Sequence, residues 1–161
     1  MTIYLQTGDQ CDYGLVGKAG YALLHRTELL QILKPHYDMG IRSDIFRDFY
    51  ENLLKLEQLV ESYRNVPAAN WVGQSPWIGF FKRLQLEFPD ANPGWSYVAN
   101  PSGGFMGFWW SPLPNKEIGL YLLLEGNKLC VKFSGREEGK RSAAETLSAK
   151  IVGLAGTHSL E

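Results

Sequence analysis

Residues 92–110 constrain the fold of this chain more than any other segment, because they hold three of its five tryptophans. From Gly94 to Ala99 large apolar side chains alternate with small or polar ones, and Phe105–Trp110 is apolar throughout. The glycine-rich stretch 101–104 between them is typical of a turn. The pattern therefore predicts a hairpin. Because neither side of its second strand is polar, each face must be covered or must be open to a partner.

Two further strands are predicted after this hairpin. Alternating apolar residues over 118–124 predict one strand, and Leu129–Phe133 predicts the next. The connection 125–128 contains glycine and asparagine, which tolerate the positive φ of a tight hairpin. The four segments together predict a four-stranded antiparallel meander.

The clearest helix covers residues 43–64, where six apolar residues recur in alternating steps of three and four. These residues are Phe46, Phe49, Leu53, Leu56, Val60 and Tyr63. Ser43 is placed to cap this helix. A second helix is predicted from Ser75, with proline at its first helical position and an end before Pro89. We expect both helices to pack on the meander, which gives an α+β fold class.

Residues 1–36 predict a smaller strand–strand–helix fragment. Its strands cover 2–6 and 20–25, and Thr27 is placed to cap a short helix that ends at Pro35. We expect this fragment to leave an open edge or to pair with another chain. The predicted organisation is thus the fragment 1–36, an α+β domain over 41–155 with a last helix from Ser142, and a disordered tail over 156–161.

The net charge and the positions of the cysteines, histidines and acids limit the functions that we expect of this chain. The net charge of −1 gives no general attraction to nucleic acid, so binding to DNA would require a local basic patch. The two cysteines, Cys11 and Cys130, lie far apart in sequence, which favours reduced thiols over a disulfide. The sequence shows no signal-like start and no apolar stretch of transmembrane length, so we expect a cytoplasmic protein without a membrane segment. No histidine or acid has the spacing of metal ligands, so the residues predict neither a metal site nor a cofactor.

The aromatic strand is the feature with the strongest binding potential. One of its faces is expected to lie on the helices, and the other is either buried under a further segment or open to stack bases or dock a protein. The candidate contact residues are the aromatic Phe108 and Trp110 and the basic Lys82, Arg83, Lys128 and Lys132. A solvated surface explains the four basic residues equally well.

Several segments resemble a bacterial branch of the PD-(D/E)XK nuclease superfamily. They are IYLQTGDQ at 3–10, AGY at 19–21, TELL at 27–30, IFRDFY at 45–50, WIGFF at 77–81 and NPSGGFMGFWW at 100–110. In that family the metal-binding acids and the catalytic lysine lie on strands upstream of a position like Ile3. The resemblance therefore implies that magnesium and catalysis belong to an upstream core, and it assigns no catalytic residue to this chain.

Three functional hypotheses follow. The first is a non-catalytic accessory domain of a nuclease-like protein, with DNA as an expected partner. The second is a protein-interaction or homodimerisation module that uses the aromatic sheet face or an open edge strand. An independent hydrolase is the least favoured, because the sequence contains no recognisable nucleophile–base pair or metal set.

Overall fold

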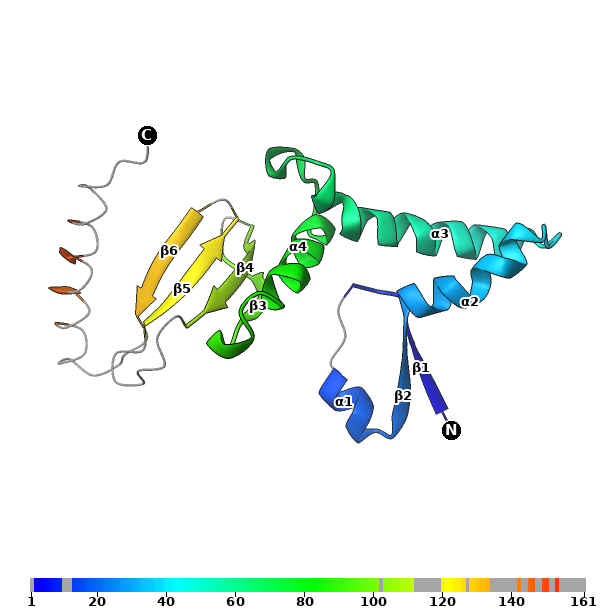
Figure 1. Cartoon of the computed structure of the whole chain (residues 1–161), viewed down its shortest axis with the longest axis horizontal. Helices are drawn as coiled ribbons and strands as arrows, with labels where there is room; N and C mark the ends of the chain where they lie inside the picture. The colour runs from blue at the N-terminus through cyan, green and yellow to red at the C-terminus, as the bar shows by residue number, and fades with distance from the viewer. Residues whose placement is uncertain are drawn as a thin grey trace. The chain divides into compact units, whose positions relative to one another are not determined.

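The computed structural model describes residues 2–9, 13–101, 103–111, 120–126 and 128–133, with the single positions 142, 145, 146, 149, 150 and 153. The described residues form a parallel pair of strands, a four-stranded antiparallel sheet and four α-helices (Figure 1). The predicted α+β fold class is therefore confirmed. The chain divides into two compact units, residues 1–82 and 83–161.

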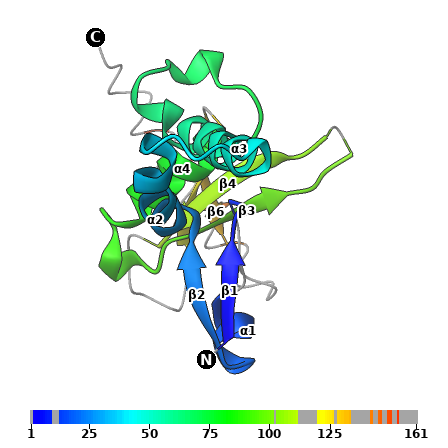
Figure 2. The ribbon, with the colours of Figure 1, turned by 90° about the vertical axis from the view of Figure 1, so that its right-hand side faces the viewer.

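The first unit opens with a parallel ladder. β1 (Thr2–Gln6) is followed by the short α1 (Tyr13–Lys18) and by β2 (Tyr21–His25). The two strands lie side by side in the same direction, with Thr2 opposite Tyr21 and Gln6 opposite His25 (Figure 2). The sequence analysis did not predict α1, because this short segment has no apolar helical period.

Two helices form the core of the first unit. Leu29 and Leu30 of α2 (Arg26–Asp38) pack with Tyr50 and Leu53 of α3 (Asp44–Glu61). Tyr37 adds to this core, since its ring stacks on that of Tyr50 with 4.4 Å between the centroids. This shared core places the N-terminal fragment and the long helix in one unit, whereas the sequence analysis divided them between residues 36 and 41.

The structure differs from the prediction at both ends of helix α2. The helix continues past Pro35 to Asp38, because a proline in the last turn removes only its own backbone N–H while the later amides still find acceptors. Thus the Met39 amide donates to the Pro35 carbonyl at 3.1 Å. The N-cap is His25 rather than Thr27, and the Glu28 carboxylate accepts from the His25 amide at 2.9 Å.

Helix α3 begins as predicted, because the Ser43 hydroxyl accepts from the Phe46 amide at 3.3 Å. Its predicted apolar stripe is buried at Leu53 and Val60, but Phe49 is 42% exposed. The short η1 (Ser62–Arg64) and η2 (Ala68–Asn70) then lead to α4 (Ser75–Gln85), which spans the boundary between the units.

The start of α4 packs tightly within the first unit. A Cβ added to Gly79 would lie 2.0 Å from the Val60 carbonyl oxygen of α3, so only glycine allows this approach. Beside it, the ring of Trp71 contacts that of Trp77 edge-on with 4.5 Å between centroids, and Phe81 is fully buried. Close backbone packing and aromatic contacts thus hold α4 on α3.

The second unit contains η3 (Pro89–Ala91) and a sheet in the order β3 (Gly94–Val98), β4 (Phe105–Trp110), β5 (Leu120–Glu125) and β6 (Lys128–Phe133). All neighbours are antiparallel, which confirms the predicted meander.

The described positions from Ser142 to Gly153 are helical. The apolar residues predicted to line this last helix, Leu147, Ile151 and Leu154, and the predicted tail 156–161 lie outside the described residues. Cys11 lies outside them as well. In the described part of the chain, none of the helices combines the length and the apolar character needed to span a membrane.

Candidate protein-interaction edge

The predicted basic contact residues differ in their surroundings. Lys82 belongs to the first unit and is half-buried, and its ammonium donates to the backbone oxygen of Asp9 at 3.1 Å. Burial lowers the pKa of Lys82. Lys82 is therefore engaged inside its own unit and is not a free surface cation.

The three basic candidate residues of the second unit each lie near a carboxylate. Arg83 pairs with Glu87 at 2.5 Å, and Lys132 pairs with Glu125 at 2.9 Å. The hydrogen bond that the Lys132 ammonium donates to the Glu125 carboxylate raises the pKa of Lys132. Lys128 is exposed and lies opposite the same Glu125 in the ladder. These pairs reduce the positive charge that an anionic partner would meet.

The aromatic contact residues are more buried than predicted. Phe108 has no exposed surface, so it does not form a platform on which a base or a partner stacks. Its ring centroid is 5.5 Å from that of Trp110 and 6.5 Å from that of Phe88. Phe88 also stacks on Trp110 at 5.3 Å, and Trp110 is half-buried. Phe88 therefore covers the face that the sequence analysis considered for binding.

The parallel ladder β1–β2 exposes more apolar surface. Ile3 and Leu5 lie on one face of β1 and are 49% and 50% exposed, and Tyr4 on the other face is 42% exposed. Tyr21 of β2 is also exposed. Within the described residues, β2 is the only strand that pairs with β1. One edge and both faces of β1 are thus accessible to a partner.

A buried charge network anchors the carboxyl end of this ladder. Arg26, which is 6% exposed, donates to the carboxylates of Asp9 and Glu57 at 2.8 Å each and to the Thr7 carbonyl at 2.9 Å. Burial by itself would lower the pKa of Arg26, but the hydrogen bonds and charges of Glu57 and Asp9 outweigh it and the pKa is raised. The guanidinium therefore stays charged and ties the end of β1 to α2 and α3.

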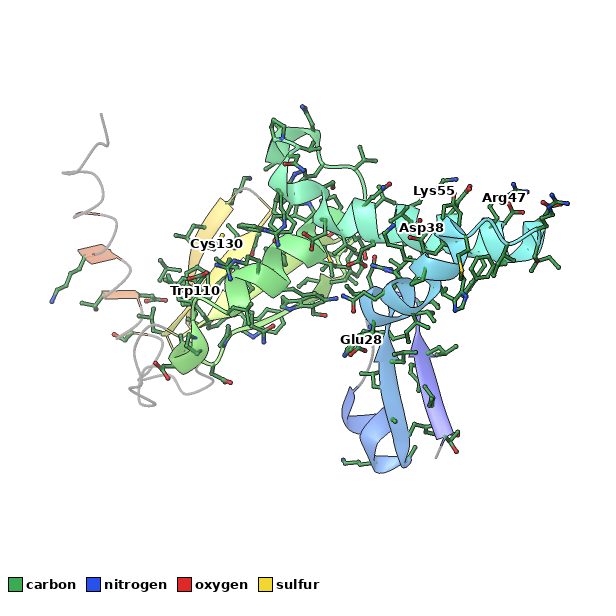
Figure 3. The ribbon with its side chains drawn as sticks, turned by 45° about the vertical axis from the view of Figure 1, so that its right-hand side comes forward. Glu28, Asp38, Arg47, Lys55, Trp110 and Cys130 are labelled. Carbon is green, nitrogen blue, oxygen red and sulfur yellow. The ribbon has the colours of Figure 1, made fainter. Side chains whose placement is uncertain are left out.

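Two further contacts complete this anchor. The Ser75 hydroxyl at the start of α4 donates to the second Asp9 oxygen at 2.8 Å, next to the contact that Lys82 makes with the Asp9 backbone. At the neighbouring strand end, the buried Gln6 side chain bonds the His25 ring at 3.0 Å. Glu28, labelled in Figure 3, lies at the start of α2 beside this end of the ladder. The end of β1 is thus held rigidly while its edge is left open.

The sequence analysis missed this network because its members come from separate elements and have no characteristic spacing. Each residue alone is an ordinary charged residue of a loop, a helix start or a helix face. The only sequence signal is that Asp9 comes three residues after one predicted strand and Arg26 comes directly after the next.

The network carries no sign of metal chemistry. In the part of the chain that the structure describes, no group of three or more histidine, cysteine or acidic side chains is arranged to hold a metal ion. No protein-family model, curated protein or solved structure matches this chain. Among the candidate features described above, the edge of β1 is the one that combines an unpaired strand edge with exposed apolar side chains.

Proposed function

We propose that this chain is a non-catalytic accessory module of a PD-(D/E)XK nuclease-like protein, and that β1 docks it by extending the sheet of the catalytic core. The observation that supports the proposal is the parallel ladder with apolar residues exposed on both faces. Parallel sheets in proteins are covered on both faces, and two strands alone are marginally stable in water. A larger sheet would supply the missing neighbour and cover.

The contrast between the two sheets also supports β1 as the docking strand. The edge strand β6 of the second unit contains Lys128 and Lys132, and charged edge strands resist pairing with other chains. β1 contains no charged residue and no proline. β1 thus lacks the features that protect an edge and has the composition of an interior strand.

In this proposal the two parts have separate roles. The core supplies the acids, the lysine and the magnesium ion, and also the contacts to DNA, because among the four basic candidate residues Arg83 and Lys132 pair with carboxylates of this chain and Lys82 is half-buried. This chain supplies two strands and the helices that follow them. The half-buried free thiol of Cys130 suits a cytoplasmic location for the assembly.

The test is a binding measurement with a defined core. A segment that carries an acid followed by an acid-x-lysine pattern on adjacent strands is sought in the same reading frame or a neighbouring gene, expressed and mixed with this chain. Sedimentation velocity then measures the complex with wild type and with the double variant Ile3→Lys, Leu5→Lys. The matched control, Ile45→Lys with Val72→Lys, places the same charges at positions off the ladder that are each 85% exposed.

The proposal predicts a one-to-one complex for wild type and for the control, and its loss for the β1 variant. A complex that tolerates both lysines in β1 would overturn the docking mode. The absence of any such core segment, or its failure to bind the wild-type chain, would overturn the function itself.

A further inference from the structure

We infer that, in the absence of the core, the free edge of β1 pairs with β1 of a second copy of this chain. The result is an antiparallel contact that joins two ladders into one four-stranded sheet in the order β2-β1-β1-β2. This inference rests on the proposed function, because it assigns a second occupant to the same edge. The argument comes from symmetry, from sequence and from charge.

Symmetry fixes the direction of the pairing. Two identical strands that pair across a twofold axis must run antiparallel, and each contact then occurs twice. With Tyr4 at the centre of β1 (Thr2–Gln6), Tyr4 lies opposite Tyr4 of the second copy. The same register places Ile3 opposite Leu5 and Thr2 opposite Gln6.

This register is self-complementary. Ile3 and Leu5 are about equally exposed and share one face of β1, so the pairing creates an apolar row on that face. The other face pairs the two Tyr4 rings between the polar Thr2 and Gln6 residues. Thr2, Ile3 and Tyr4 belong to the residue types that are enriched in strands. The pairing therefore places exposed apolar side chains of the two copies side by side on both faces of the sheet.

Charge selects β1 over the other exposed edges. β1 carries no ionised side chain, so a second copy meets no like charge across the contact. Self-pairing of β6 would instead bring Lys128 and Lys132 of both copies into one short ladder. The edge strand β3 is also uncharged, but Tyr97 is the only residue of β3 among the exposed large apolar side chains, whereas β1 has three, Ile3, Tyr4 and Leu5. β1 thus combines an uncharged sequence with apolar surface on both faces.

The contact is small, which sets its strength. One five-residue strand from each copy buries less than the roughly 1,200 Å² of a stable interface, so the dimer should be weak and reversible. The core would displace it by occupying the same edge. We therefore expect monomer at low concentration and dimer at high concentration.

The test combines sedimentation equilibrium with cysteine cross-linking on the whole chain. Sedimentation covers about 1 µM to about 1 mM, the range of weak association. Cross-linking uses Tyr4→Cys in a Cys11→Ala, Cys130→Ala background, with Ile3→Cys alone and Ile3→Cys combined with Leu5→Cys as register tests. Val72→Cys, at an exposed position off the ladder, is the control for random collision.

The inference predicts that the fraction of dimer increases with protein concentration. It also predicts rapid disulfide formation between two copies for Tyr4→Cys and for the Ile3→Cys, Leu5→Cys double variant, and little disulfide formation for Ile3→Cys alone or for Val72→Cys. A chain that stays monomeric, or a dimer in which Tyr4→Cys forms disulfides no faster than Val72→Cys, would overturn it. Either outcome leaves the core complex intact, whereas a failed core complex beside a cross-linked dimer would overturn only the proposed function.

Discussion

The approach of α4 to α3 allows a sharp prediction at Gly79. Alanine there should destabilise the first unit, because its Cβ would lie 2.0 Å from the Val60 carbonyl oxygen and 2.9 Å from a Tyr63 ring carbon. The distance to the oxygen must reach at least 3.4 Å before the contact is ordinary, and a backbone atom cannot rotate away. Overpacking of this kind lowers the free energy of unfolding by about 3 kcal/mol, whereas alanine in a helix raises it by about 1 kcal/mol relative to glycine. We therefore expect Gly79→Ala to lower the free energy of unfolding by about 2 kcal/mol.

Thermal and urea unfolding followed by circular dichroism measures this effect. A loss of about 2 kcal/mol corresponds to a fall in Tm of roughly 10 °C for a unit of this size. The control is Gly17→Ala in α1, where an added Cβ meets nothing within 4 Å, so its stability should be unchanged or slightly higher. If Gly79→Ala were as stable as wild type, α4 would not pack on α3 in this way.

Three further predictions concern buried groups. Glu57→Gln should lower the free energy of unfolding by about 3 kcal/mol in urea titrations, because it removes one of the two negative charges that neutralise the buried Arg26. By contrast, Asp38→Asn, which neutralises one member of an exposed pair, should cost less than about 0.5 kcal/mol. Burial lowers the pKa of Lys82, so at pH values below this lowered pKa the charged ammonium destabilises the folded state. This cost fades as pH rises toward the ordinary value of 10.5, and the stability of wild type relative to Lys82→Met should therefore increase with pH in that window. Phe108→Ala should cost about 4 kcal/mol by the same titration, since the side chain is fully buried, and a loss below about 1 kcal/mol would contradict its place in the core.

The regular elements could be predicted because each depends on a local period. The alternation in β3 and the steps of three and four in α3 each reflect one side of an element facing a core, and β4 was predictable as an apolar run that follows a glycine-rich turn. The Ser43 cap was predictable for the same reason, since its partner Phe46 is three residues away. Local chemistry was thus sufficient for the meander and for the start of α3.

Features that depend on tertiary contacts could not be predicted. The sequence does not show that Leu53 packs with Leu29 and Leu30, so it placed the division of the chain too early. It does not show that Phe88 covers Phe108, and for that reason Phe108 was considered a contact residue. The anchor around Arg26 includes the Arg26–Glu57 contact across 31 positions and the Ser75–Asp9 contact across 66 positions, and no spacing rule reports such contacts.

The central claim, that the β1–β2 ladder is incomplete without a partner, is tested most directly by amide hydrogen exchange of the dilute wild-type chain. β1 has an unpaired edge and exposed faces, while β5 lies between two strands of the meander. Amides exchange through local openings whose free energies differ along a chain. The account predicts much faster exchange for β1 than for β5 at high dilution, and protection of alternate β1 amides once the edge is occupied. Protection of β1 equal to that of β5 in the dilute monomer would contradict it.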